Sequence, residues 1–402
     1  MNKKKILLCW GYNRQNWIEN FENLNDQFEF IYLFYLEKSE EAEVYTNNKI
    51  IYYTDYKTPK KLLNYVKPYK VVFMGLDGLV SIALNIQCIK LGITTYYMAH
   101  GAATLSHEDY TTVAYEKRNL LKESFSIKFR LWLFNLRFLC AALGLKYITH
   151  LPLLLKFQYD KTKMHPIFAM QKNKTFLRVP SGYILFANEA RDFFVEQDDV
   201  SYSIMNIIGN LEINSFTKLI PQVDPILGKY ILYLETPLSE IEDNEFEIKL
   251  LKKEEYNELI SAMNSYALSL GMKLVIKLHP YSFVNTYLFQ HENIIYKKAI
   301  NKEQLIMNCS GIIFYNSSLA VPALYYKPGL MFTIGKLDDF QQKIKRCNCC
   351  YVSDYKILID KPEQLTFLKE TATFDKSTFV DTYIGEGVDG NGLKRLAKIF
   401  NS

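Results

Sequence analysis

The sequence KLVIKLHP, residues 273–280, joins an apolar run to a histidine–proline pair and decides how the surrounding chain is interpreted. Leu274, Val275 and Ile276 form the continuous apolar run typical of a parallel strand that is covered on both faces. Pro280 fixes its own backbone and biases His279 toward an extended conformation. In open α/β sheets, ligands bind beyond the carboxyl ends of the strands. The stretch therefore predicts a strand that ends in a ligand-binding loop.

Short apolar runs alternate with helical patterns on both sides of this stretch, which predicts an α/β fold with parallel sheets. In the first half we expect a buried helix at Leu79–Leu91 and strands at Ile6–Cys9, Phe28–Phe34, Ile50–Tyr53, Val71–Met74, Thr94–Ala99, Tyr183–Ala187 and Ile204–Ile208. In the second half we expect helices at Glu254–Leu270 and Leu393–Phe400, and strands at Tyr230–Leu234, Lys273–Leu278, Gly311–Tyr315 and Leu330–Thr333.

Two doubly wound, Rossmann-like domains that face a cleft are the simplest architecture for this pattern. A stretch with two prolines and one glycine, residues 221–228, precedes the second alternation and predicts the boundary. We expect the first domain at residues 1–225. The second domain, with the terminal helix, would occupy residues 226–402.

The composition indicates a folded protein and excludes several partners. The chain has 402 residues, of which 49% are hydrophobic and 23% are charged. A net charge of +5 is too weak to predict nucleic-acid binding. Seven cysteines, an odd number, favour reduced thiols over a disulfide framework. The start shows a short apolar run and no cleavage site for a signal peptide, so we expect a cytoplasmic protein.

One segment, residues 117–156, differs from the alternating pattern. It mixes eight lysines and arginines with the apolar runs Leu131–Phe134 and Leu136–Leu145. These runs are too short and too charged to span a bilayer. A basic amphipathic segment can lie on a membrane surface, and it can equally form a pair of core helices with solvated basic residues. Both interpretations stay open, and the first would place the protein at the inner face of the cytoplasmic membrane.

A second motif supports a ligand-binding role for the loop at Lys277, His279 and Pro280. Lys277 can supply a positive charge and His279 a hydrogen-bond donor to a phosphate. At residues 311–322 an apolar strand runs through Asn316 into Ser317 and Ser318, and a helix follows. Either serine is a natural N-cap, and a helix N-terminus favours an anion. About one βα unit separates the two motifs, so we expect neighbouring strands that point at one phosphate.

These two motifs resemble a group of bacterial two-domain (GT-B) transferases. The group includes CMP-sialic acid and CMP-Kdo transferases, and CDP-glycerol or CDP-ribitol polyol-phosphate transferases. The resemblance covers mainly residues 230–335, with support from residues 71–104. It implies that His279, Ser317 and Ser318 bind the phosphate of a cytidine nucleotide. Thr236, at the end of the first strand of the second domain, could also contact the donor.

The first domain should supply the acceptor side. Asp77-Gly78 and His100-Gly101 each follow an expected strand. The sialyltransferases have an acidic-acidic-Gly motif with an Asp base, which Asp77-Gly78 matches in part. The polyol-phosphate transferases have a His-Gly pair followed by a Thr, and His100 fits that pattern. Imidazole also titrates near neutral pH without tuning, so His100 is favoured as the base over Asp77.

The resemblance implies a metal-independent glycosyltransferase that moves a sialic acid or Kdo-type sugar from a CMP-sugar to a bacterial capsule or lipooligosaccharide. The acceptor could be lipid-linked, and no cofactor beyond the donor is expected. The alternatives are a CDP-glycerol or CDP-ribitol transferase, a UDP-sugar GT-B enzyme or epimerase, and a non-catalytic capsule-assembly protein.

Two acidic pairs, Asp198-Asp199 and Asp338-Asp339, are interpreted as solvated turns and not as metal ligands. No P-loop or dinucleotide-binding glycine motif is present.

Overall fold

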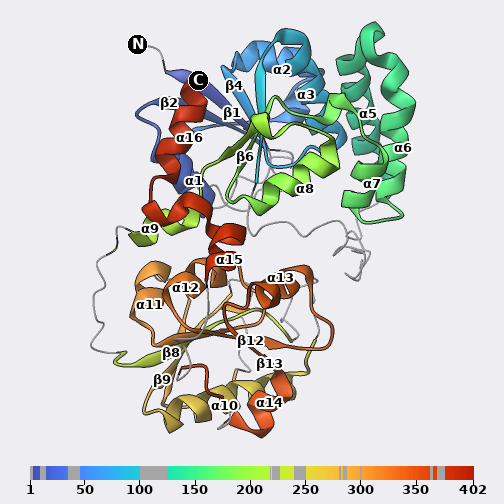
Figure 1. Ribbon diagram of the computed structural model, residues 1–402. Helices are drawn as coiled ribbons and strands as arrows, with labels where there is room; N and C mark the ends of the chain where they lie inside the picture. Colours follow the sequence, from blue (N-terminus) through green and yellow to red (C-terminus); the bar gives the residue numbers. More distant parts are fainter. Residues whose placement is uncertain are drawn as a thin grey trace. The chain divides into compact units, whose positions relative to one another are not determined.

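The computed structural model describes residues 3–9, 15–34, 46–99, 125–217, 219, 227–239, 250–279, 282–283, 288–298, 301–362, 365–368 and 376–402. The chain divides into two compact units (Figure 1). Unit 1 comprises residues 1–211 and 391–402, and unit 2 comprises residues 212–390. Each unit is a parallel α/β sheet, so the predicted fold class is confirmed.

Unit 1 contains a seven-stranded parallel sheet in the order β3-β2-β1-β4-β5-β6-β7. Its strands are β1 (Lys4–Cys9), β2 (Phe28–Phe34), β3 (Lys49–Tyr52), β4 (Lys70–Phe73), β5 (Thr94–Met98), β6 (Gly182–Leu185) and β7 (Met205–Ile207). Its helices are α1 (Gln15–Glu22), α2 (Pro59–Val66), α3 (Leu79–Leu91), α5 (Phe125–Tyr147), α6 (Leu151–Lys161), α7 (Pro166–Lys172), α8 (Glu189–Asp198) and α16 (Gly392–Asn401), with short turns η2 (Tyr53–Asp55), η3 (Ile148–His150), η4 (Phe176–Arg178) and η5 (Tyr202–Ile204).

Unit 2 contains a six-stranded parallel sheet in the order β10-β9-β8-β11-β12-β13. Its strands are β8 (Tyr230–Leu234), β9 (Lys273–Lys277), β10 (Ile294–Lys297), β11 (Gly311–Phe314), β12 (Gly329–Thr333) and β13 (Tyr351–Asp354). After a turn η6 (Leu211–Ile213), its helices are α9 (Asn214–Thr217), α10 (Lys253–Ser269), α11 (Lys302–Asn308), α12 (Ala320–Tyr326), α13 (Asp339–Cys347), α14 (Tyr355–Asp360) and α15 (Ser377–Phe379), followed by η10 (Val380–Ile384) and η11 (Gly385–Asp389).

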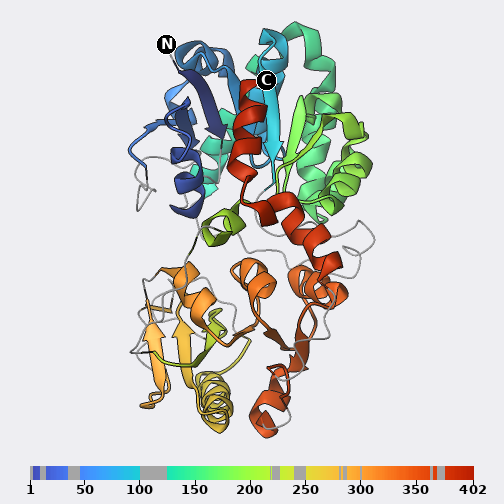
Figure 2. The ribbon, with the colours of Figure 1, turned by 60° about the vertical axis from the view of Figure 1, so that its left-hand side comes forward.

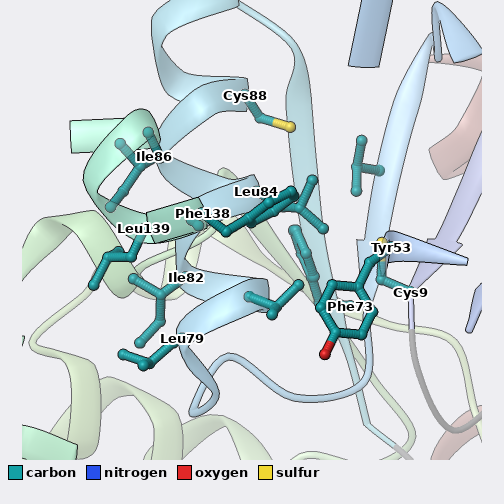
Figure 3. Packing of buried hydrophobic residues seen from close by; sticks show 14 of the residues in the cluster. Cys9, Tyr53, Phe73, Leu79, Ile82, Leu84, Ile86, Cys88, Phe138 and Leu139 are labelled. Carbon is teal, nitrogen blue, oxygen red and sulfur yellow. The ribbon is translucent and has the colours of Figure 1, made fainter. Parts of the chain in front are cut away.

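The core of unit 1 forms where α3 is covered on both sides. Ten consecutive residues of α3, Leu79–Cys88, are buried, as its mostly apolar sequence predicts. Figure 3 shows Phe73 of the sheet and Phe138 and Leu139 of α5 in one cluster with the side chains of α3. The helix ends at Gly92, whose left-handed backbone (φ 68°) terminates it without steric cost.

The terminal helix differs from the expected domain division. The sequence assigns it to the donor-binding domain, whereas α16 belongs to unit 1 (Figure 2). Phe400 packs edge-on against Phe28 and closes over β2. The ammonium of Lys4 donates to the Asn401 carbonyl at 3.0 Å, and that of Lys70 donates to the Ile399 carbonyl at 2.7 Å. These bonds satisfy the last carbonyls of the helix, and they explain why it packs on unit 1.

The expected boundary at residues 221–226 lies outside the described residues, and the two units divide between Leu211 and Glu212. All seven cysteines are free, and six of them are buried.

Candidate functional site

The candidate donor site lies at the carboxyl edge of the unit 2 sheet. Strands β8, β9 and β11 run parallel, with Leu234 of β8 in register with both Lys277 of β9 and Phe314 of β11. The residues that follow these three positions therefore leave the sheet at one level. The sequence predicts that β9 and β11 are neighbours, and this prediction is wrong, because β8 lies between them.

The sheet order reverses between β8 and β11, since the chain first builds β9 and β10 on one side and then returns to the other. Such a reversal opens a crevice at the carboxyl ends of the two strands, and ligands of doubly wound sheets bind there. The residues after β8 begin with Glu235 and Thr236, and those after β11 include Asn316. The His279 loop leaves the adjacent strand β9.

Glu235 organises this edge, and sequence reasoning missed it. Its side chain is only 4% exposed. One carboxylate oxygen accepts from the backbone N–H of His279 at 2.5 Å, and the other accepts from the Tyr256 hydroxyl at 3.0 Å. The Glu235 N–H in turn donates to the Lys277 carbonyl at 3.1 Å. A carboxylate directly after a fully buried strand is the signal that could have revealed it, because a buried charge requires partners.

Burial shifts the pKa values of the three ionisable groups at this edge, Glu235, Lys277 and His279. Burial raises the pKa of Glu235, and the hydrogen bond from the His279 backbone partly opposes that rise. Burial lowers the pKa of Lys277, and the nearby Lys302 ammonium lowers it further, while Glu235 opposes. Burial also lowers the pKa of His279, with the charge of Lys277 as the second cause. The site thus gathers basic groups whose positive charge would be stabilised by an anion.

Two of the predicted donor contacts hold the strand ends together. The Thr236 hydroxyl donates to the Asn316 carbonyl at 2.6 Å, which joins the ends of β8 and β11. The Asn316 side-chain amide donates to the carboxylate of Asp338. A hydroxyl whose hydrogen is already donated can only accept a further bond. Thr236 therefore cannot donate to a phosphate without first giving up Asn316.

Asp338 is not a solvated turn residue as the sequence suggested. It is the N-cap of α13 and accepts from the Gln341 N–H at 2.8 Å, in a reciprocal capping box. Gln341 is fully buried, and its amide also donates to the Tyr315 carbonyl at 3.0 Å. Through these bonds, Asp338 and Gln341 fix the chain that leads from β11 to the serines.

The serine pair also differs from the expected arrangement. Helix α12 begins at Ala320 with Leu319 as its N-cap and no side-chain capping bond, so the prediction that Ser317 or Ser318 caps it is wrong. Both serine carbonyls accept from amides of the first turn instead. Ser318 is exposed and Ser317 is partly exposed. Neither hydroxyl bonds to another described residue, which leaves both able to donate to a ligand.

In unit 1, Asp77 follows β4 as predicted. Its carboxylate pairs with the Lys161 ammonium at 2.6 Å, and that ammonium also donates to the Asp77 carbonyl at 2.8 Å. Gln158 donates to the same carbonyl at 3.0 Å. The carboxylate remains 44% exposed. Gly78 is the N-cap of α3, and its carbonyl accepts from the Ser81 hydroxyl at 3.0 Å.

Three of the predicted site residues, His100, Gly101 and Pro280, lie outside the described residues. The strands that precede Asp77 and His100 are neighbours, because Phe73 of β4 is in register with Tyr97 of β5. In the sequence, Asp77 and His100 thus each follow one of two neighbouring strands.

In the other acidic pair, Asp199 is exposed at the end of α8 as expected, whereas Asp198 is structural. Asp198 is buried, accepts from the Tyr183 hydroxyl at 2.7 Å and pairs with the buried Arg178 at 2.8 Å. This contradicts the interpretation of Asp198 as part of a solvated turn, because a buried carboxylate of this kind ties α8 to β6 and η4. Within the described residues, no group of three or more histidine, cysteine or carboxylate side chains could hold a metal ion.

Comparison with known proteins gives a fold and no family. No family model and no curated sequence matches the chain. Among solved structures, UDP-GlcNAc 2-epimerase from Methanocaldococcus jannaschii matches with a TM-score of 0.54 and 12% identity, covering 99% of this chain and 100% of that one. The calicheamicin glycosyltransferase CalG4 matches with a TM-score of 0.53 and 11% identity, covering 100% and 98%.

The wall teichoic acid polymerase TagF matches with a TM-score of 0.50 and 12% identity, covering 99% of this chain and 88% of that one. Identities this low show the fold alone. The chain therefore has the two-domain architecture of GT-B enzymes, with two Rossmann-like domains, as the sequence predicted.

Proposed function

We propose that the protein is a glycosyltransferase that moves a sialic acid or Kdo-type sugar from a CMP-sugar to a bacterial surface glycan. The observation that carries this proposal is the gathering of Lys277 and His279 around the buried Glu235, at the carboxyl edge of the unit 2 sheet. The two free serine hydroxyls after β11 add donors at the same edge. This combination suits a phosphate, and the Lys-x-His-Pro and Ser-Ser pattern suits cytidine.

The proposed reaction is a direct displacement at the anomeric carbon of the sugar. An acceptor hydroxyl attacks that carbon, and the bond from the carbon to the phosphate oxygen breaks. The cytidine monophosphate leaves with the bonding electrons. Lys277, His279 and the serines stabilise its negative charge through charge-assisted hydrogen bonds, so the reaction needs no metal ion. The imidazole of His100 takes the proton of the acceptor hydroxyl.

Asp77 is assigned a positioning role and not the role of the base. Its carboxylate accepts from the Lys161 ammonium at 2.6 Å, so the side chain is already held in place by a partner within unit 1. We expect His100→Gln to abolish turnover and Asp77→Asn to reduce it by about tenfold or less. A larger loss in Asp77→Asn than in His100→Gln, measured as initial rates, would reverse the assignment.

The donor nucleotide is tested by thermal shift with CMP, CDP, UMP, UDP and GDP, on the wild type and on His279→Ala. We expect stabilisation by the cytidine nucleotides only, and its loss in the variant. His291, which lies just before β10 in the same unit, gives the matched control, because His291→Ala should keep the shift. A preference for uridine nucleotides, or an unchanged shift in His279→Ala, would refute the cytidine site.

A polyol-phosphate transferase is the second candidate, and the His100-Gly101 pair with the following Thr104 favours it. In that case the acceptor oxygen attacks the phosphorus that carries the polyol, and cytidine monophosphate again leaves. Incubation with CMP-sialic acid, CMP-Kdo or CDP-glycerol and a glycan acceptor separates the two classes by the mass added to the acceptor. Consumption of a UDP-sugar without acceptor would instead identify an epimerase. Nucleotide binding without any turnover would identify an assembly protein.

A further inference from the structure

Helix α5 is largely apolar, but only one of its faces is fully buried. Phe138, Leu139, Ala142 and Leu143 are fully buried against α3. The helical run Phe129–Lys161 is long and apolar enough to cross a membrane by length and composition, yet only 28% of its apolar window is buried. A core helix would be mostly buried, as α3 is. The exposed apolar residues of the run Phe129–Lys161, in α5 and α6, therefore require another explanation (Figure 1).

Five large apolar side chains are exposed on the ends of α3 and α5 and on the turns η3 and η4. Leu145 is 97% exposed, the highest value among the large hydrophobic residues that the structure describes. The other four, Ile148, Phe176, Leu91 and Ile89, are between 37% and 52% exposed. We call these five residues the α3–α5 patch. Scattered single exposed residues are ordinary, but a group of five on adjoining segments marks an interaction surface.

The segments that carry the patch are fixed to one another. The Lys90 ammonium donates to the Leu143 carbonyl at 2.7 Å and also to the Ala142 carbonyl, which ties the end of α3 to the end of α5. The Tyr147 ring packs edge-on against Phe176, with 5.8 Å between centroids, which ties η4 to the same place. Gly144, at φ 50°, breaks the helix and turns Leu145 outward.

The charge around the patch is strongly one-sided. The described stretches 79–99 and 125–188 contain eleven lysines and arginines and a single carboxylate, Asp160. Asp160 is buried and accepts from the Asn173 amide at 2.9 Å, so it presents almost no negative charge to solvent. The whole chain has a net charge of only +5, so the rest of the chain is net acidic. Two of the eleven cations are paired with carboxylates outside these stretches, Arg178 with Asp198 and Lys161 with Asp77. The other nine leave an excess of positive charge on α3, α5, α6, α7 and the turns between them.

We propose that the α3–α5 patch docks unit 1 onto an anionic phospholipid bilayer, with Leu145 inserted and the surrounding cations on the headgroups. The helices lie on the membrane and do not cross it, because Gly144 breaks α5, and Arg130 and Arg137 are exposed along it. Apolar insertion and attraction to anionic lipid reinforce each other in surface-bound helices. This inference extends the proposed function without depending on the donor.

A lipid surface fits better than a protein partner for a physical reason. The most exposed side chain, Leu145, protrudes beyond the helix break with the exposed Lys146 beside it. A protruding aliphatic side chain between cations gains little from a flat acidic protein surface, which would have to desolvate carboxylates around it. A bilayer offers phosphates at the level of the cations and hydrocarbon just below them.

Vesicle flotation of the full chain tests the proposal, with phosphatidylcholine vesicles that contain either no phosphatidylglycerol or about a quarter of it. We expect binding to the anionic vesicles only, and its loss in about 1 M salt, where charges are screened beyond about 3 Å. Leu145→Glu should reduce partitioning by about tenfold or more, because it removes an apolar side chain from lipid. Lys146→Glu should reduce it by at least about fivefold, the effect of one cation at the surface.

Leu268→Glu, at an exposed leucine of α10 in unit 2, is the matched control and should bind like the wild type. Circular dichroism and the CMP thermal shift should be unchanged in all three variants, which separates this proposal from the nucleotide site. The proposal would be overturned by equal binding to neutral and anionic vesicles, by no binding to either, or by Leu145→Glu binding as well as the wild type. A dimer that Leu145→Glu dissociates, without vesicle binding, would assign the patch to a second copy of the chain.

Discussion

Each sheet has one carboxylate that follows a strand at the point where the strand order reverses, between β1 and β4 in unit 1 and between β8 and β11 in unit 2. One of these carboxylates is exposed and the other is buried. Asp77, after β4 of unit 1, is 44% exposed and pairs with the Lys161 ammonium. Glu235, after β8 of unit 2, is 4% exposed and accepts from a backbone N–H and a tyrosine hydroxyl. Asp77 can rearrange at low energetic cost. Glu235 cannot move without leaving buried donors unsatisfied.

This difference indicates a division of labour between the two edges. The edge of unit 2 is rigid, because Glu235 holds the His279 loop and Thr236 holds Asn316. A rigid edge suits a site that must bind the same nucleotide phosphate in every cycle. The edge of unit 1 is held by an ion pair that solvent can compete for, which suits a side chain that adjusts to an acceptor. Four experiments test this division.

The largest expected effect is that of Glu235→Ala on stability. The substitution leaves the His279 N–H and the Tyr256 hydroxyl without their acceptor in a buried place. Each such group costs about 1–3 kcal/mol, so we expect the free energy of unfolding to fall by about 3 kcal/mol. Urea unfolding followed by circular dichroism measures it. Glu258→Ala, at an exposed position of α10, should change stability by less than about 0.5 kcal/mol. Similar values for the two variants would contradict a structural role for Glu235.

Next in size is the effect of Lys277→Met on nucleotide binding. Lys277 ends β9 beside Glu235, and a charged hydrogen-bond donor to phosphate contributes about 1.5–3 kcal/mol. We expect at least a tenfold weaker affinity for CMP, measured by calorimetry. Lys273→Met removes the same charge at the amino end of the same strand and is the control. If both variants weaken binding equally, the effect is long-range electrostatics and not a contact at the carboxyl edge.

The elements that the sequence predicted well are those with continuous apolar runs. Phe28–Phe34, Leu79–Leu91 and Tyr230–Leu234 have in the structure the bounds that were predicted for them. Such segments are buried on both faces, so local pattern and tertiary environment favour the same conformation. The edge strands β10 and β13 were missed. Both are partly exposed and carry polar residues, as Tyr351–Asp354 illustrates.

The contacts within the site could not be predicted from local patterns. The position of β8 between β9 and β11 follows from how the chain returns across the sheet, which a local pattern does not record. The bond from the His279 backbone to Glu235 joins residues 44 positions apart. The packing of α16 on β2 joins residues hundreds of positions apart. In each case the residue types were visible in the sequence, but their partners were set by the topology.

The difference in unfolding free energy between Glu235→Gln and the wild type should change with pH. We expect this change to be smaller than the two effects above, and the pKa shift of Glu235 fixes its sign. Burial raises the pKa of Glu235 above its ordinary value of 4.5, so the folded protein holds this proton more tightly than the unfolded chain. The wild type therefore loses stability as the pH rises from about 4.5 through the folded pKa. Glu235→Gln has no such proton. Its amide oxygen can still accept from the His279 N–H, and its NH2 group can donate to the Tyr256 hydroxyl in place of the bond that the carboxylate accepted. The stability of the variant relative to the wild type should thus increase with pH in urea titrations, and a constant difference would disprove the shift.

The smallest expected effect is that of the Asp77–Lys161 pair on stability. The ammonium is 20% exposed and the carboxylate 44%, so solvent screens much of their attraction. A double-mutant cycle with Asp77→Asn, Lys161→Met and both together should give a coupling energy of about 0.5–1 kcal/mol. That value should fall further in about 1 M salt, because the Debye length shortens to about 3 Å there and screens exposed charges more strongly. A coupling energy as large as the loss in Glu235→Ala would mean that Asp77 is as rigidly held as Glu235. The edge of unit 1 would then be preorganised in the same way, and Asp77 would regain its place beside His100 as a candidate base.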